Sequence, residues 1–489
     1  MKPYLKKTID YAAGNFFNKI LLILLLPIFT HFLLPEQYAV YTNLMIFFSF
    51  ASLIYLLGIH QAIFSHFYDV KTDQYKFSLI SSVYIILSLF GFILSILIIL
   101  FRVELSVLVL RSVKYSHLFY YIAVILFFNM LFSISLNLMN IMEKSRQYAI
   151  ISALQNIIVL LLIIVFSINN KFSIEYYFIF LAIASVIASF VGISQIIKMM
   201  SKMQVAKSEK KYFSNEIVSS MLKFGIVMIP GTISMLILQA SDRYMLTYLS
   251  ANTMYDVGIY SAGYRIGMIM HFMVTMVSLV YLPYAMKIAK EPHAQAINKS
   301  MFKYYVIAGS LFGSFIIIYS QEIFRFIIDS NYLASYKIVF AGVISSFLYG
   351  VFNIININYY ARKKAGNITL AVFLGSILNI LLNFILIPKI GILGAGISSI
   401  IAYFFIVIFN YFVAVYLYKI KYPILLVFIG LLILTISALF NHYYILNLKL
   451  FIIKSVIVLC IAGVLIVISK RDEQIQKMIM ILRKDKNED

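Results

Sequence analysis

The sequence predicts an all-α polytopic membrane protein, and three observations carry that prediction. Of the 489 residues, 63% are hydrophobic and only 12% are charged, and the mean hydropathy is +0.95. Apolar runs of about 20 residues, the length of helix that crosses a hydrocarbon core of ~30 Å, alternate with short polar segments. The ~10-residue alternating segments of a membrane β-barrel are not the pattern of this chain. A soluble globular protein is excluded by the same composition.

The positive charges predict how the chain crosses the membrane. With both termini in the cytoplasm, 26 Lys and Arg fall in cytoplasmic segments, nine in external segments and five in spans. This asymmetry follows the positive-inside rule, so the net charge of +21 reflects topology and gives no reason to expect nucleic acid as a partner. We count about fourteen spans, at residues 12–34, 39–64, 78–101, 117–142, 148–168, 176–197, 217–240, 257–285, 301–320, 338–360, 367–388, 393–417, 424–441 and 450–469.

The two ends of the chain add little chemistry. The basic N-terminal segment precedes an apolar run, 12–34, that is too long for a signal peptide, so we expect it to remain as an anchor. Cys460 is the single cysteine and lies in the last apolar run, which leaves neither a disulfide nor a metal motif. The tail from Arg471 to Lys486 has one apolar helical face and is expected to lie on the inner surface.

A charged linker and an internal repeat predict the domain organisation. The linker at 198–216 divides the first twelve spans into six and six, and an offset of 219 residues places Asn137 on Asn356 and 143–146 on 362–365. Because six is even, equivalent spans keep their direction, so the repeat is parallel and the pathway lies between two facing bundles. The predicted domains are a six-helix bundle at 1–200, a cytoplasmic linker at 201–216, a second bundle at 217–420, and two extra helices with the tail at 421–489.

Three cations inside predicted spans favour an anionic substrate. Lys19, Lys223 and Arg265 lie well inside apolar runs, where a charge costs about 2.5–3.5 kcal/mol on insertion scales. All 19 acidic residues are read as lying in loops, tails or span ends, so the expected cavity is lined by positive charge alone. The alternative for each cation is snorkelling to a headgroup, which we assign to Lys303 and Lys454 near span ends.

Asparagines and prolines supply the remaining candidate site residues. Asn15, Asn18, Asn137 and Asn356 are candidates for the polar lining of a sugar-binding cavity, the alternative being hydrogen bonds that join helices. Helix-bending residues are the candidate hinges between inward-open and outward-open states. They are Pro27, Pro230, Gly231 and Pro283.

No motif for catalysis is present in the sequence. A hydrolytic triad, metal-ligand spacing and a phosphate-binding glycine loop are all missing, so neither an enzyme nor a cofactor is predicted. Coupling to a proton or sodium gradient is compatible with the sequence.

Several short motifs are spread over nearly the whole chain. They are Leu34-Pro35-Glu36-Gln37-Tyr38, Phe224-Gly225 with Pro230-Gly231, Asp242-Arg243-Tyr244-Met245-Leu246, Val257-Gly258-Ile259-Tyr260-Ser261-Ala262 with Tyr264-Arg265, and Leu382-Asn383 with Leu386-Ile387-Pro388, Gly391 and Gly394-Ala395. With these motifs the sequence resembles the polysaccharide-biosynthesis flippases, the O-antigen type of oligosaccharide translocase. That family belongs to the superfamily of multidrug and toxic compound extrusion transporters and lipid II flippases. Tyr38-Ala39 stands where the family usually has Tyr-Gly.

The resemblance implies a function that the residues alone do not specify. It implies translocation of an undecaprenyl-pyrophosphate-linked oligosaccharide across the bacterial inner membrane by alternating access, for O-antigen or another surface polysaccharide. Its partners would be membrane lipids and, within the pathway, a polymerase and a chain-length regulator. Lys19, Lys223 and Arg265 would then hold the diphosphate.

Three other functions are weighed against this one. An ion-coupled multidrug or small-molecule antiporter has the same fold, but it would be expected to bury an Asp or Glu in the first bundle. A membrane-bound glycosyltransferase or polymerase would have a large external loop or a carboxylate motif, and the longest external loop expected here has only some 17 residues. A non-transporting scaffold of the same fold is the third alternative.

Overall fold

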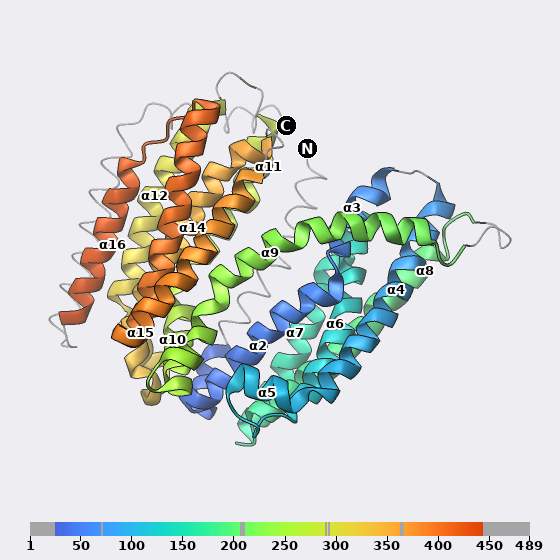
Figure 1. Ribbon diagram of the computed structural model, residues 1–489, viewed down its shortest axis with the longest axis horizontal. Coiled ribbons are helices and arrows are strands. Elements are labelled where there is room, and N and C mark those ends of the chain that lie inside the picture. The colour runs from blue at the N-terminus through green and yellow to red at the C-terminus, as the bar shows by residue number, and fades with distance from the viewer. Residues whose placement is uncertain are drawn as a thin grey trace. The chain divides into compact units, whose positions relative to one another are not determined.

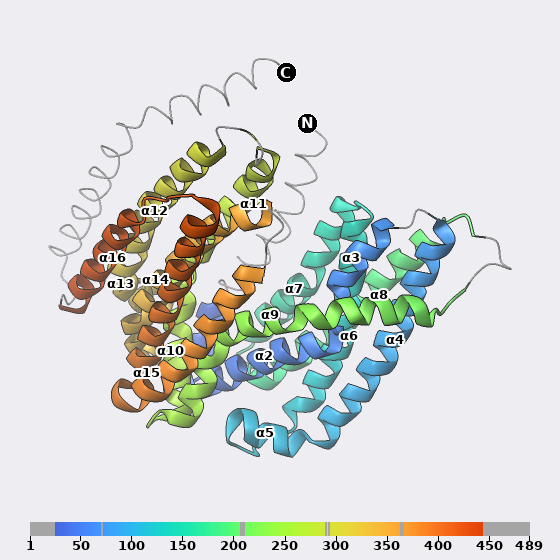
Figure 2. The same cartoon turned by 45° about the horizontal axis from the view of Figure 1, so that its top comes forward.

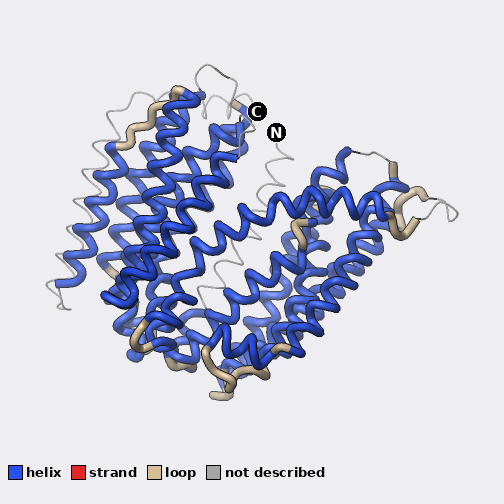
Figure 3. Tube along the Cα trace, in the orientation of Figure 1, coloured by secondary structure: helices blue, strands red, loops and turns tan. Residues whose placement is uncertain are grey.

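Helices form all of the regular structure in the residues that are described. The computed structural model describes residues 25–69, 72–205, 211–288, 291, 294–361 and 366–443 (Figure 1). Within those ranges, helices are joined by short loops and turns (Figure 3). Among the described residues, eight helices are long and apolar enough to cross a membrane, or nine when the bent helix α9 is counted. The chain is therefore a multi-pass α-helical membrane protein, as its composition predicts; the predicted last span, 450–469, lies outside the described residues.

The chain divides into two compact units, Met1–Ala240 and Ser241–Asp489. In the first unit, α6 packs against α2, α4 and α8, and the short helix α5 follows α4 (Figure 2). The helices that begin in this unit are α2 (Pro35–Leu56), α3 (Ile59–Asp69), α4 (Asp73–Leu100), α5 (Arg102–Leu110), α6 (Leu118–Ile141), α7 (Ser145–Ile168), α8 (Ile174–Met200) and α9 (Asn215–Leu249).

In the second unit, α14 packs against α10, α11, α12 and α15. It is the most buried of the candidate spans, which makes it the centre of this unit. The elements of the unit are α10 (Thr253–Gly267), α11 (Met270–Lys287), α12 (Ala294–Ile318), α13 (Ser320–Ile327), the 3-10 helix η2 (Ser330–Ser335), α14 (Tyr336–Ala361), α15 (Gly366–Tyr418) and α16 (Leu425–Tyr443).

One predicted span is broken near its middle. The run 39–64 forms α2 and α3, because Leu57 and Gly58 adopt left-handed φ angles of 49° and 67°. The break lets α9 approach very closely, since a Cβ atom on Gly225 would lie 2.9 Å from the carbonyl carbon of Gly58. Two glycines therefore fix where the first half of α9 crosses the first unit.

Two predicted spans run together in α15. Its 53 residues would be about 80 Å long as one helix, well over the ~30 Å of a hydrocarbon core. The chain turns at Gly391, where φ is 56° and ψ is −132°, a conformation open almost only to glycine. The two arms of α15 therefore correspond to the predicted spans 367–388 and 393–417.

The unit boundary falls inside α9 rather than in the charged linker. The first part of α9 packs with the first unit, and the residues from Ser241 onward belong to the second unit. Hydrogen bonds tie its start to the first unit, from the Ser214 N–H to Ser82 Oγ (2.9 Å) and between Ser220 Oγ and His66 Nε2 (2.8 Å). One helix thus continues from one unit into the other.

Candidate functional site

The second unit buries a carboxylate among neutral hydrogen-bond donors. Asp242 on α9 is 1% exposed. Its Oδ2 accepts from the Tyr260 hydroxyl on α10 (2.6 Å) and the Ser399 hydroxyl on α15 (2.5 Å), and its Oδ1 accepts from Asn383 Nδ2 (2.8 Å). Three helices therefore meet at one side chain that can carry a negative charge.

Two asparagines on α15 extend this network. Asn379 and Asn383 are both fully buried, and because they are four residues apart they lie on the same face of the helix. Asn379 Oδ1 accepts from Asn383 Nδ2 (3.1 Å) and from the Ser241 hydroxyl (2.7 Å). Asn383 Oδ1 is buried and has no hydrogen-bond partner among the described residues. The network thus contains one acceptor oxygen still able to take a ligand.

An arginine lies beside the carboxylate, over two aromatic rings. The Arg243 guanidinium carbon is 5.6 Å from the ring centroid of Tyr260 and 5.2 Å from that of Tyr264. The two rings stack with centroids 5.4 Å apart. A cation held against aromatic faces in a water-poor site is stabilised by the ring quadrupoles. Positive charge is therefore available next to Asp242.

We name Asp242, Tyr260, Asn379, Asn383 and Ser399 the carboxylate network. The sequence did not predict this network, because the apolar run before Asp242 ends at residue 240 and places the carboxylate at a span end. Helix α9 continues to Leu249, which places Asp242 seven residues, or about 10 Å, inside the helix. The rule that acidic residues lie outside the spans is therefore wrong at this position. The apolar residues that follow Asp242 were the signal that the helix continues.

Two of the three predicted cations, Lys223 and Arg265, lie in helices of the described residues. Lys223 is exposed on the first part of α9, and Arg265 is half buried in the last turn of α10, just before the break at Met268. Lys19 lies outside the described residues. An ion pair with Asp242 is a further role that the sequence allows for Arg265, and it stays a prediction. A cavity shared by the three cations remains a prediction.

The predicted asparagines also differ in their surroundings. Asn137 on α6 donates its Nδ2 to the carbonyl oxygen of His60 (2.5 Å), which joins α6 to α3. Asn356 on α14 is fully buried, and neither of its amide atoms has a hydrogen-bond partner among the described residues. Asn15 and Asn18 lie outside those residues. Asn356 is thus a buried polar group with unused donors and an unused acceptor, as a ligand-lining residue would be.

The candidate hinges fall in three helices. Pro230 and Gly231 lie in α9, whose segments Asn215–Val227 and Ile229–Leu249 are inclined by 41°. Proline removes a backbone donor and clashes with the preceding turn, which explains a bend at this point. Pro27 lies in the helical stretch before α2, and Pro283 lies in α11. Among the described residues, no group of three His, Cys, Asp or Glu could hold a metal ion.

Comparison with known proteins identifies the family of the chain and its fold. The sequence profile described as "Polysaccharide biosynthesis protein" matches residues 4–289. An uncharacterized membrane protein of Methanocaldococcus jannaschii is 24% identical over 281 residues, which cover 56% of this chain and 53% of that protein. The chain thus spans about half the length of this curated relative.

Two groups of solved structures have a similar fold. The inward closed conformation of the lipid II flippase MurJ matches with a TM-score of 0.74 and 19% identity over 95% of this chain and 99% of MurJ. The inward-facing conformation of a multidrug resistance MATE family transporter of the MOP superfamily matches with a TM-score of 0.64 and 14% identity, over 82% and 96% of the two chains. At these identities the likeness establishes the fold.

Proposed function

Because the chain belongs to the polysaccharide biosynthesis protein family, we propose that it flips a lipid-linked oligosaccharide across a membrane by alternating access. The substrate proposed is an undecaprenyl-pyrophosphate-linked unit, delivered across the bacterial inner membrane for O-antigen or another surface polysaccharide. Both termini would be cytoplasmic. A polymerase and a chain-length regulator would act on the product.

The family and the fold support transport rather than catalysis. A matching profile over residues 4–289 concerns polysaccharide biosynthesis, and the lipid II flippase shares the fold over nearly the whole length of both chains. A lipid-linked glycan combines a polar head with a polyprenyl tail, so a helical transporter that lets the tail remain in the bilayer fits its shape. This agreement between family and fold is the observation that carries the proposal.

The charged part of such a substrate is its diphosphate. Arg265, half buried at the end of α10, would hold it through paired hydrogen bonds, since a guanidinium matches phosphate geometry bidentately. Lys223 and Lys19 would add point charges. Gly263 and Gly267 allow α14 to approach α10 here, and a Cβ atom on Gly267 would lie 2.7 Å from the Gly342 Cα atom. Arg265 therefore projects from a tightly packed helix pair that can hold it in place.

The carboxylate network supports cation coupling, which we propose as the energy source. Its oxygen atoms suit a hard monovalent cation such as Na⁺, and Asn383 Oδ1 offers an acceptor that has no other use among the described residues. Asp242, Asn379, Asn383 and Ser399 would hold the ion. A bound cation would cancel the buried charge of Asp242, so ion binding and release would change which arrangement of α9, α10 and α15 is stable.

A proton is the alternative coupling ion at the same carboxylate. A proton would neutralise Asp242 without needing the amide oxygens of Asn379 and Asn383. Removing those oxygens therefore separates the two ions, because it should abolish stabilisation by Na⁺ but leave a proton-coupled protein active.

A second candidate function is ion-coupled export of small cationic molecules. The observation in its favour is Asp242, since a buried carboxylate is what a cation exporter requires. It lies in the second unit, whereas the antiporter alternative was expected to bury its acid in the first. Positive charge in the same unit, at Arg243 against the Tyr260 ring and at half-buried Arg265, disfavours a cationic substrate.

A complementation experiment tests the proposed function. A null strain expressing this chain at matched membrane abundance should regain surface polysaccharide and lose the accumulated lipid-linked intermediate. Arg265→Ala should abolish export and Arg265→Lys should restore only part of it, because an ammonium makes no bidentate pair. Full activity of Arg265→Ala, or resistance to cationic drugs without polysaccharide export, would reject the flippase.

A further inference from the structure

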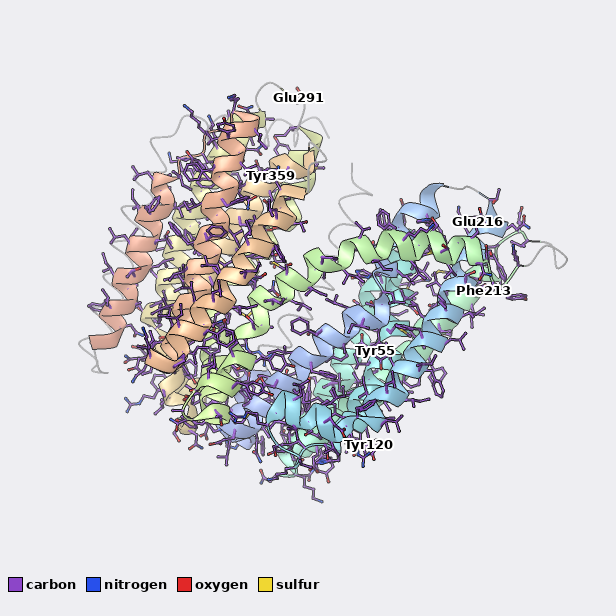
Figure 4. The ribbon with its side chains drawn as sticks, in the orientation of Figure 1. Tyr55, Tyr120, Phe213, Glu216, Glu291 and Tyr359 are labelled. Carbon is purple, nitrogen blue, oxygen red and sulfur yellow. The ribbon has the colours of Figure 1, made fainter. Side chains whose placement is uncertain are left out.

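A polar pocket lies in the first unit, where two long helices begin side by side. It has a volume of about 450 Å³, within the usual range of small-molecule sites. The starts of α4 and α9 form its two walls, with Thr72 and Ser78 on one side and Ser214, Glu216 and Ser220 on the other. Lys211, at the end of the charged linker, completes its rim. We name it the linker pocket; Figure 4 marks Glu216 at the start of α9.

The two helix starts make the pocket electropositive. Helices α4 and α9 have 28 and 35 residues, so each presents the positive end of a full helix dipole here. The first N–H groups of a helix have no acceptor within it, and they readily bind anions. Lys211 is exposed and adds a full positive charge. Dipoles and cation therefore act in the same direction.

A buried hydroxyl in the pocket points independently to a ligand. Ser78 is only 5% exposed, and its Oγ has no hydrogen-bond partner among the described residues. A buried hydroxyl without a partner is unfavourable by about 1–3 kcal/mol, so such groups usually serve a ligand or a water molecule. Ser78 lies in the second turn of α4 and is one of the residues that line the pocket.

The pocket is held in shape by contacts around it. The Ser214 N–H donates to Ser82 Oγ, and Ser220 Oγ is 2.8 Å from His66 Nε2. The Tyr212 ring packs edge-on against Phe77, with centroids 5.3 Å apart, which fixes the linker segment that carries Lys211. The walls are therefore built before any ligand arrives.

We propose that the linker pocket binds a phosphate group. The two helix starts and Lys211 would attract the charge, and the Ser78 hydroxyl would donate to a phosphate oxygen. Two carboxylates oppose the anion, Glu216 in the pocket lining and Asp73 in the first turn of α4, whose Oδ2 accepts from the Gln204 N–H. The charge balance therefore predicts moderate affinity that rises when Glu216 is neutralised. The phosphate could belong to a lipid headgroup or to a soluble phosphate, and the pocket chemistry is the same for both.

A fluorescent reporter can be placed at this site alone. The chain contains no tryptophan, so Tyr212→Trp introduces a single one beside the pocket, on a side chain that is 59% exposed. Its emission would be recorded for the purified full-length protein in mixed micelles of dodecyl maltoside and phosphatidylcholine. One arm adds inorganic phosphate or pyrophosphate, and the other replaces part of the lipid with phosphatidic acid. Sodium chloride at the same ionic strength is the control.

Three substitutions in the reporter background should change affinity in different directions. Lys211→Ala should weaken binding by about fivefold to tenfold and Ser78→Ala by about threefold to tenfold, while Glu216→Gln should tighten it by about threefold. The matched control is Lys202→Ala, an exposed linker lysine that does not line the pocket. Ser78→Ala should not lower the unfolding midpoint, because it removes a buried hydroxyl that has no partner.

The outcomes separate the two phosphate sources. Saturable emission changes with the soluble anions identify soluble phosphate, and changes with phosphatidic acid alone identify a lipid headgroup; either supports the proposal. No saturable change in either arm, or equal affinities in Lys211→Ala and Lys202→Ala, would overturn it. Lys211 is exposed, so its variant tests the proposal even where the Ser78 variant folds poorly.

Discussion

The two units share an arrangement of helices but differ in what they bury. Adding 219 to the bounds of α6 gives 337–360, where α14 is Tyr336–Ala361, and adding it to α4 gives 292–319, where α12 is Ala294–Ile318. Contacts follow the same pattern, since α6 packs on α2 and α4 as α14 packs on α10 and α12. The offset found in the sequence therefore matches the succession of helices.

Four of the five members of the carboxylate network correspond by sequence to apolar residues of the first unit. The exception is Tyr260, which corresponds to Tyr41, also a buried tyrosine, at 2% exposed. By this offset the sequence of the first unit has no carboxylate at the position equivalent to Asp242. Subtracting 219 from Asp242, Asn379, Asn383 and Ser399 gives Ile23, Leu160, Ile164 and Phe180.

Neutralising Asp242, which has no equivalent carboxylate in the first unit, should have the largest effect on export. Asp242→Asn keeps the size of the side chain but removes the charge, so we expect loss of export by about 100-fold or more and loss of stabilisation by Na⁺. The measurements are surface polysaccharide at matched membrane abundance and the unfolding midpoint in sodium against choline chloride. Wild-type export by Asp242→Asn would mean that the buried charge is structural.

Removing an amide of the network should have the next largest effect. Asn383→Ala removes a hydrogen-bond donor to Asp242 and the acceptor oxygen proposed for the ion. Substitution of residues that support a metal ligand typically lowers metal affinity or activity by about 10–100-fold, so we expect apparent Na⁺ affinity to fall by that factor. The matched control is Asn410→Ala, also a fully buried asparagine on α15, whose Nδ2 donates to the Ile406 carbonyl oxygen of the same helix. Equal losses in the two variants would show that any buried asparagine of α15 is needed, and would remove the case for a site.

The positions of the helices are predicted well by the sequence, but the break at Gly58 is not. Composition and periodicity predict the helices well, because apolar length is a local property, and the predicted runs 117–142 and 338–360 are α6 and α14 to within a few residues. The break of the run 39–64 at Gly58 was not expected. It involves close approach to the backbone of Gly225, some 170 residues away, which no local pattern contains.

The buried carboxylate was not expected from the sequence, because the fold decides which side chains are buried. Asp242 is 1% exposed although the sequence places it at a span end. Lys223 interrupts an apolar run and is exposed on α9, and its role toward the substrate stays a prediction. The donors to Asp242 come from residues 18, 141 and 157 positions away. Folding brings these distant residues together, and a single sequence does not show which of them will meet. The local sign of the network in the sequence is the spacing of Asn379 and Asn383, four residues apart.

Tyr260 and its equivalent Tyr41 allow a test in which a smaller loss of Na⁺ affinity is expected in one unit and none in the other. Tyr260→Phe removes one hydrogen bond to a charged group, worth about 1.5–3 kcal/mol, so apparent Na⁺ affinity should fall by about tenfold or more. Tyr41→Phe makes the same change at the equivalent position, where the ring packs on Phe29 with centroids 4.8 Å apart. It should leave Na⁺ stabilisation unchanged. Equal effects would mean that both tyrosines only support packing.

The smallest expected effect concerns the turn that follows the equivalent helices α7 and the first arm of α15. The first unit turns at Asn170, with φ at 52°, in the left-handed region that asparagine tolerates. The second unit turns at Gly391, where ψ is −132° and a side chain is strained by about 1–3 kcal/mol even though open space surrounds it. Gly391→Ala should therefore lower the unfolding midpoint measurably, while Asn170→Gly should leave it nearly unchanged.

Gly391→Asn sharpens this last test, because asparagine relieves strain only in the left-handed region. If the second unit needs the particular conformation at Gly391, the Asn variant should be about as unstable as the Ala variant. Both midpoints are measured by thermal unfolding of the purified protein in the same detergent. Recovery of wild-type stability by asparagine would mean that the turn can shift into the conformation used at Asn170, and that the two units differ less at this turn than their backbones indicate.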